Sequence, residues 1–260
     1  MFRILLSKLS VAILAGVGML ATATPAEAAF RMRIDNNSNG QGVVFTDGLA
    51  PAANNPSAGV LSFTGANGAF TVIVATGTSQ PPQNLNPGAL HGLDLVGLSV
   101  SSATGGTMTM SLQLTGLSYS GVLGLLAHVG GTLTGANSSI NFSLWANGAN
   151  NFPAYGPDQY SFGAIGAIGG LPAGSVNAYG PGGVTINTAG SFSADGFVEF
   201  TSGGTYSLFL QAVITFGSGG GSASFDFLGS TFVPAPAGLV LFASAVPGLA
   251  FGVIRYRRKK

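Results

Sequence analysis

Lysine and arginine are absent from Ile34 to Ile254, in a chain of 260 residues that has only nine of them. The long body between the two ends therefore has no basic surface of the kind that binds nucleic acid, and nucleic acid is excluded as a partner. Cysteine is absent as well, which excludes disulfides and thiol chemistry. Charged residues make up 7% and hydrophobic residues 46% of the chain. Because disorder needs the opposite balance, the body is predicted to fold.

The N-terminus has the three parts of a secretory signal peptide. A basic start is followed by an apolar run from Leu9 to Ala21 and by small residues that place Ala26 and Ala28 in an A-x-A pattern. Pro25 would interrupt a longer helix, so a retained anchor is the less favoured alternative. The sequence predicts that signal peptidase removes residues 1–28.

The C-terminus joins an uncharged stretch to a basic tail. Residues 237–254 carry no charge and would span about 27 Å as a helix, close to the thickness of a bilayer's hydrocarbon core. Pro247 lies within the stretch and is expected to kink it. Basic residues resist translocation, so the tail is predicted to stay in the cytoplasm and the body to lie on the other side of the membrane. These stop-transfer residues are Arg255, Arg257, Arg258, Lys259 and Lys260.

Val233, Pro234, Ala235 and Pro236 stand directly before that stretch. A Val-Pro-x-Pro motif, one apolar helix and a basic cluster at the extreme C-terminus resemble the PEP-CTERM protein-sorting signal. The resemblance implies processing by an exosortase, a membrane cysteine transpeptidase of Gram-negative bacteria that make exopolysaccharide, with release of the body to the cell surface or matrix. The family usually has Glu where this chain has Ala235. The resemblance covers residues 233–260 and implies a destination, not an activity.

Residues 29–232 are predicted to form one all-β domain. Glycine, with 42 residues in the chain, favours turns, and apolar and polar residues alternate along many short segments. About ten strands without a helical period predict a single antiparallel β-sandwich, jelly-roll-like or barrel-like, flanked by the signal helix and a C-terminal transmembrane helix. The predicted strands are 42–46, 59–64, 69–75, 93–101, 107–114, 139–144, 191–200, 206–216 and 223–227. Gly217–Gly221 is interpreted as a hairpin loop and 147–183 as a loop insertion.

The segment Asp35-Asn36-Asn37-Ser38-Asn39-Gly40 matches the opening of a calcium-binding loop. Its candidate ligands are Asp35, Asn37, Asn39 and the nearby Asp47. Thr46 stands where a bidentate Glu is wanted, and the same residues also favour an ordinary polar turn. The turn is the preferred interpretation, and no cofactor is expected.

Other candidate chemistry is sparse. His91 and His128 are the only histidines; His91 lies three residues from Asp94, but no serine stands in a G-x-S-x-G motif. Asp195 and Glu199 are predicted to share a strand face, as a glycosidase pair would, although a general acid also needs burial.

Four aromatic residues flank or occupy the predicted loop insertion: Trp145, Tyr155, Tyr160 and Tyr179. Aromatic rings on the loops of a sandwich can stack on sugar rings. The alternative, which is preferred, is that they pack the insertion against the sheets.

The combined prediction is an exported, non-enzymatic cell-surface or extracellular-matrix protein. It would be held briefly in the inner membrane, processed at its sorting signal and associated with exopolysaccharide or biofilm. The alternative is a secreted carbohydrate-active enzyme or a calcium-dependent sugar-binding module. A third option is a permanently anchored membrane protein that no transpeptidase processes.

Overall fold

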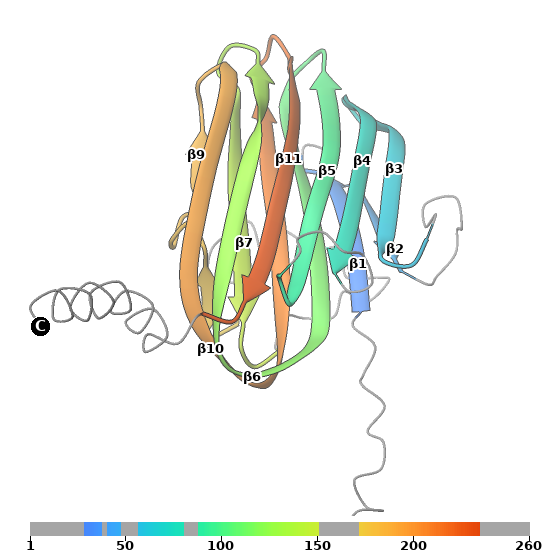
Figure 1. Ribbon diagram of the computed structural model, residues 1–260. Coiled ribbons are helices and arrows are strands. Elements are labelled where there is room, and N and C mark those ends of the chain that lie inside the picture. The colour runs from blue at the N-terminus through green and yellow to red at the C-terminus, as the bar shows by residue number, and fades with distance from the viewer. Residues whose placement is uncertain (1–28, 38–40, 48–56, 81–87, 151–171, 235–260) are drawn as a thin grey trace, which may run out of the picture.

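The computed structural model describes residues 29–37, 41–47, 57–80, 88–150 and 172–234. These ranges contain strands and no helix, arranged in two layers (Figure 1). The strands are β1 (Ala29–Asn36), β2 (Gln41–Thr46), β3 (Val60–Asn67), β4 (Phe70–Gln80), β5 (His91–Ser102), β6 (Gly106–Thr134), β7 (Ser139–Asn147), β8 (Ser175–Asn177), β9 (Val184–Ile186), β10 (Gly190–Phe216) and β11 (Gly221–Phe232).

The long strands β6 and β10 take part in both layers. They pair antiparallel from Gly106 opposite Phe216 to Leu133 opposite Gly190. The first half of β6 and the second half of β10 belong to a first sheet, in the order β2-β1-β6-β10-β7, with β8 and β9 both paired to β7. Their other halves belong to a second sheet, in the order β3-β4-β5-β11-β6-β10. The predicted all-β antiparallel fold is confirmed, and its two layers fit a sandwich. The predicted signal and transmembrane helices lie outside the described residues.

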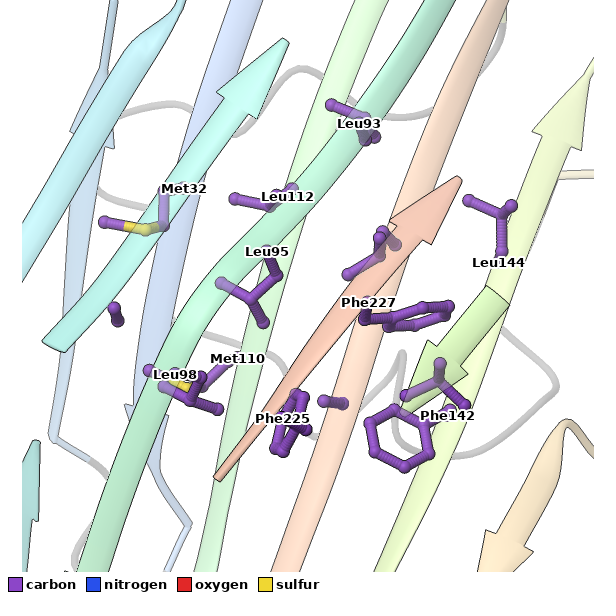
Figure 2. Close-up of a cluster of buried hydrophobic side chains, with 14 of the residues drawn as sticks. Met32, Leu93, Leu95, Leu98, Met110, Leu112, Phe142, Leu144, Phe225 and Phe227 are labelled. Atoms are coloured by element: carbon purple, nitrogen blue, oxygen red, sulfur yellow. The ribbon is translucent and has the colours of Figure 1, made fainter. Parts of the chain in front are cut away.

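The core lies between the two sheets and is built by period-two alternation (Figure 2). From the first sheet, Phe142 makes edge-to-face contacts with Phe225 and Phe227 of the second sheet, at centroid distances of 4.9 and 5.3 Å. Leu144 fills the space left by Gly229, where a Cβ would lie 2.6 Å from the leucine side chain. Large side chains of one sheet therefore interlock with small residues of the other.

Both long strands bend where the chain passes from one sheet to the other, at the bottom of Figure 1. Gly121 of β6 and Gly204 of β10 lie at this bend with φ of +127° and +142°, which other residues rarely adopt. The hydroxyl of Ser202 donates to the carbonyl oxygen of Tyr119 across the bend at 2.7 Å. The glycines thus allow the same two strands to hold both layers.

The segment 217–220 is an arch between the sheets, and the predicted hairpin there is wrong. The end of β10 pairs with β6 and β7 in the first sheet, whereas β11 pairs with β5 and β6 in the second. The connections from β5 to β6 and from β6 to β7 also cross between the sheets at this end. These arches meet backbone to backbone: a Cβ on Gly105 would lie 2.2 Å from the carbonyl oxygen of Gly217, and one on Gly217 would lie 2.3 Å from that of Ala136.

Candidate functional site

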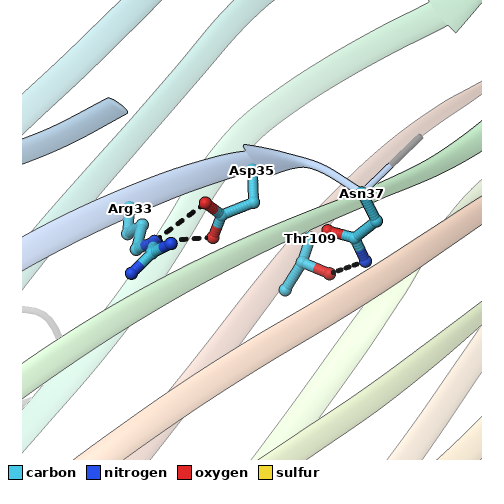
Figure 3. Close-up of polar contacts among 4 residues, drawn as sticks. All are labelled: Arg33, Asp35, Asn37 and Thr109. Carbon is cyan, nitrogen blue, oxygen red and sulfur yellow. Dashed lines mark hydrogen bonds and ion pairs between the residues drawn. The ribbon is translucent and has the colours of Figure 1, made fainter. Parts of the chain in front are cut away.

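The turn that resembles a calcium loop joins β1 to β2. Nε of Arg33 lies 2.8 Å from Oδ1 and 2.7 Å from Oδ2 of Asp35, and both side chains are buried (Figure 3). Burial raises the pKa of the Asp35 carboxyl, while the hydrogen bond and charge of Arg33 act in the opposite direction. The side-chain amide of Asn37 donates to Oγ1 of Thr109 at 2.9 Å. Both candidate ligands therefore already have partners within the fold.

Asp47 lies at the other end of the same strand pair. Its N–H donates to the carbonyl oxygen of Phe30, which places it about 16 Å along β1 from Asp35. Its Oδ2 accepts a hydrogen bond from the N–H of Gly59 at 2.7 Å. The described residues contain no group of three or more His, Cys, Asp or Glu side chains able to hold a metal ion. The structure thus keeps Asp35 and Asp47 apart, and Asn39 lies outside the described residues.

His91 and Asp94 point to opposite faces of the second sheet, because β5 alternates between buried leucines and outward residues. Nδ1 of His91 is hydrogen-bonded to the hydroxyl of Tyr206. That hydroxyl also bonds Oγ1 of Thr231 at 2.8 Å. Burial lowers the pKa of His91. His91 therefore links strands within the core and does not pair with Asp94.

Asp195 and Glu199 share the outer face of β10, as predicted from their spacing. Both are exposed, and their Cα atoms, four positions apart on the strand, are separated by about 13 Å. The general acid of a glycosidase needs a buried environment. Oδ1 of Asp195 instead lies 2.6 Å from Nδ1 of His128, directly opposite on β6. The exposure of both side chains does not fit a glycosidase pair.

Trp145 and Tyr179 pack against the sheets. Trp145 of β7 is buried, with its ring centroid 5.6 Å from that of Phe209. The hydroxyl of Tyr179 donates to the carbonyl oxygen of Ala194 at 3.3 Å. For these two residues the contacts favour packing over sugar stacking, and Tyr155 and Tyr160 lie outside the described residues.

The predicted export and sorting signals fall almost wholly outside the described residues. Val233 and Pro234 are described and follow Phe232, the last residue of β11, directly. Ala235, Pro236, the basic tail and the predicted signal-cleavage residues are not described. In the part of the chain that is described, no helix has the length and apolar character needed to cross a membrane.

Exposed Phe197 and half-buried Phe232 form an aromatic platform on the outer face of the second sheet. Phe197 of β10 is 53% exposed, and its ring centroid lies 5.9 Å from that of Phe232 with 24° between the planes. Strand β6 runs between β10 and β11 and presents Gly124 beneath the rings. A Cβ on Gly124 would lie 2.6 Å from the ring of Phe232 and 3.0 Å from that of Phe197. The absence of a side chain there leaves room for both rings above the strand.

Apolar and acidic side chains border the aromatic platform. Leu126 and Val122 of β6 are 37% and 49% exposed. Asp195 and Glu199 stand two residues to either side of Phe197 on the same face of β10, each about 7 Å away along the strand. The platform is therefore an apolar surface with a carboxyl group on each side of its most exposed ring.

Two more carboxyl groups lie further along the same face. Burial raises the pKa of Asp94 to about 6, and the negative charge of Asp226 acts in the same direction. Asp226 itself accepts a hydrogen bond from the N–H of Gly97. The only Lys or Arg residues within the described ranges, Arg31 and Arg33, lie on β1 of the first sheet. The outer face of the second sheet is consequently acidic.

Sequence reasoning did not identify Phe197 or Phe232 as site residues. The sequence signal that could have identified them is that both occupy outward-facing positions in the alternation of their strands. Phe197 has the same parity as the outward residues Asp195 and Glu199, so it is an apolar residue on the polar face of its strand. Phe232 likewise has the parity of Asp226 on β11. Two aromatic residues on outward positions of different strands can be matched only once the pairing with β6 is known.

No family model matches the chain, and a search of curated proteins finds no match. Among solved structures, the carbohydrate-binding module TmCBM61 in complex with β-1,4-galactotriose is 11% identical, with 67% of this chain and 87% of that one covered and a TM-score of 0.30. The K1 cleaved adhesin domain of Lys-gingipain from Porphyromonas gingivalis W83 is 12% identical over 68% and 99% of the two chains, with a TM-score of 0.28. The CBM22 tandem domain of Paenibacillus barcinonensis Xyn10C is 11% identical over 68% and 46%, with a TM-score of 0.29. TM-scores this low do not establish a shared fold or function.

Proposed function

We propose that the protein is an exported, non-enzymatic protein of the cell surface or extracellular matrix that binds polysaccharide through the aromatic platform. The observation that carries this proposal is the pair of exposed Phe197 and half-buried Phe232 above Gly124, with a carboxyl group on either side of Phe197. Sugar rings place their apolar faces on aromatic rings, and their hydroxyl groups donate to carboxylates. Two rings whose planes differ by 24° suit an internal stretch of a polymer better than a small enclosed ligand.

A binding role without catalysis is supported by the exposure of the carboxyl groups. Asp195 and Glu199 are the acids nearest the platform, and both are exposed, whereas the general acid of a glycosidase needs a buried environment. The proposal therefore expects that the protein releases no sugar from a polysaccharide that it binds.

Export and sorting belong to the same proposal and rest on the sequence. The N-terminal signal peptide would carry the body through the inner membrane, and the motif that begins at Val233 would direct its processing. Because β11 ends at Phe232, a cut near the motif would leave every described strand complete. The platform would then stay with the released body.

The binding proposal is tested by affinity electrophoresis of the full chain, in detergent micelles, through gels that contain purified polysaccharides. At least one polysaccharide should retard the protein, and Phe197→Ala should abolish the retardation. Ile73→Ala is the matched control, because Ile73 is 54% exposed on β4 of the same sheet but away from the platform. Equal retardation of wild type and Phe197→Ala would refute the assignment of the site.

The export proposal is tested by intact-mass analysis of the protein from membrane and extracellular fractions of cells that make it. A released species that starts at Ala29 and ends between Pro234 and residue 237 is expected. A species that keeps Lys260 and stays in the membrane would overturn the sorting proposal and favour permanent anchoring.

A further inference from the structure

The acidic residues beside the aromatic platform restrict which sugars it can hold. A pyranose ring is about as wide as the phenyl ring on which it stacks, so a sugar placed on Phe197 directs its ring substituents toward both neighbours on β10. Glu199 lies opposite Gly124 in the pairing of β10 with β6, at the edge of the platform. Its carboxylate makes none of the described hydrogen bonds or ion pairs. It is therefore free to receive a donor from the ligand.

Asp195, on the other side of Phe197, uses one of its two carboxylate oxygens in a contact with His128. Its Oδ1 lies 2.6 Å from Nδ1 of His128, and the two side chains are 75% and 54% exposed. One carboxylate oxygen and much of the imidazole therefore remain accessible beside the platform. The two carboxylates bracket the stacking ring on the strand that carries it.

The charge of the face argues against an acidic polysaccharide. Asp94, Asp195, Glu199 and Asp226 all lie on it, and His128 is the one described side chain there that can carry positive charge. A uronate polymer would bring repeated negative charges against these groups without an arginine or lysine to meet them, and like charges placed together oppose binding. A polymer with repeated positive charges complements the face.

Resting on the proposed function, we infer that the platform binds a polysaccharide of hexosamines with free, protonated amino groups. The ring of one residue stacks on Phe197 and Phe232, and the ammonium group of that residue or its neighbour donates a charge-assisted hydrogen bond to Glu199 or Asp195. Such bonds are shorter and about twice as strong as those between neutral groups. Aromatic stacking supplies affinity for sugars in general, and the carboxylates supply the preference for the ammonium group.

The experiment is isothermal titration of the full chain in detergent micelles with three hexasaccharides: glucosamine, N-acetylglucosamine and galacturonate. The pH is held below the pKa of the sugar amine, so that the amino groups are charged. Glucosamine hexasaccharide should bind at least about tenfold more tightly than its acetylated form, and added salt should reduce that difference. Galacturonate should bind most weakly of the three.

Variants assign the preference to residues. Glu199→Gln should bring the affinities for the glucosamine and N-acetylglucosamine hexasaccharides close together, whereas Phe197→Ala should weaken both by a similar factor. Ser193→Ala, at an uncharged outward position of the same strand, is the matched control and should leave both affinities unchanged.

The outcomes separate this inference from the function on which it rests. Equal affinity for the three hexasaccharides, lost in Phe197→Ala, would uphold polysaccharide binding and overturn the preference for amino sugars. Tightest binding of galacturonate would overturn the preference as well. If none of the hexasaccharides binds and no polysaccharide retards the protein in gels, both proposals fail.

Discussion

The hydroxyl of Tyr206 is hydrogen-bonded to Nδ1 of His91 and joins the bend of β10 to the second sheet. The same hydroxyl bonds Oγ1 of Thr231, which in turn donates to the carbonyl oxygen of His91 at 3.2 Å. Tyr206 is fully buried, and burial raises the pKa of its hydroxyl well above the usual value, although the bond to Thr231 acts in the opposite direction. The hydroxyl therefore stays protonated and serves as a fixed link between three strands.

Tyr206→Phe should lower the unfolding free energy by about 1–3 kcal/mol, because it leaves buried polar atoms of His91 and Thr231 without their partner. Urea denaturation followed by tryptophan fluorescence measures the change. Tyr119→Phe is the control, since the hydroxyl of Tyr119 takes part in none of the described hydrogen bonds, and it should cost less than about 0.5 kcal/mol. Equal costs for the two variants would contradict the role given to Tyr206.

His91 should make the fold less stable in mild acid. Its pKa is lowered in the folded protein, so as the pH falls below about 6.5 the unfolded chain binds the proton first. The unfolding free energy contributed by this group then decreases as the pH falls. In His91→Gln the decrease between about pH 7 and pH 5 should be smaller than in the wild type. His128→Gln, at an exposed histidine, should retain it; an unchanged acid response in His91→Gln would refute the assignment.

Much of the fold could be predicted from sequence because alternation is a local signal. Each predicted strand overlaps an observed one, and the alternate apolar residues of the predicted strand 206–216, from Tyr206 to Phe216, all belong to the core. The predicted hairpin after Phe216 is wrong because a glycine-rich loop of that composition suits a hairpin and an arch equally. The choice depends on which strands the neighbours pair with, and that is a property of the whole sheet. The sequence predicts two strands, 191–200 and 206–216, where the structure has one, because Gly203 and Gly204 resemble a turn but form a bend within β10.

The candidate site was less predictable than the fold. Acidic and histidine side chains stand out in a sequence because few residue types can act as general acids, bases or metal ligands, so Asp195 and Glu199 are candidates from the sequence alone. Phenylalanine is a usual core residue, and Phe197 and Phe232 are 35 positions apart along the chain. Their contact exists because β6 separates β10 and β11 and has glycine at position 124. The pairing of these three strands cannot be predicted from local sequence patterns.

Asp94 should destabilise the fold near neutral pH. Its Oδ1 is buried without a hydrogen-bond partner among the described residues, and its pKa is raised from 3.8 to about 6. The stability associated with its protonated form is complete below the unfolded value and is lost as the pH rises through about 6. Asp94→Asn should therefore raise the unfolding free energy at about pH 7 by about 1–2 kcal/mol, and by much less near pH 4. Glu199→Gln, at an exposed carboxyl, is the control; a benefit of Asp94→Asn that does not depend on pH would contradict this account.

The packed arches should tolerate no side chain at Gly105. Its φ is +80°, and a Cβ would lie 2.2 Å from the carbonyl oxygen of Gly217. Gly105→Ala should cost about 2–4 kcal/mol of unfolding free energy, from the strained backbone and the clash together. Gly219→Ala is a matched control, because a Cβ there meets nothing within 4 Å. Guanidinium denaturation of both variants checks the difference, and a cost for Gly105→Ala as small as that for Gly219→Ala would show that the arches do not pack as described.

Gly124 offers a way to disturb the aromatic platform without removing either ring. A Cβ on Gly124 would meet the outer ends of Phe232 and Phe197, which are half-buried and exposed side chains and can rotate away. Gly124→Ala should therefore change the unfolding free energy by less than about 1 kcal/mol, since alanine is better suited to a strand than glycine. It should nevertheless weaken polysaccharide binding about tenfold, because the displaced rings no longer present one surface. Gly203→Ala, where a Cβ meets nothing within 4 Å, is the matched control and should bind as the wild type does.

Because stability and binding are measured on the same preparation, a loss of binding can be assigned to the rings. Wild-type binding by a folded Gly124→Ala variant would mean that the polysaccharide does not lie on these two rings.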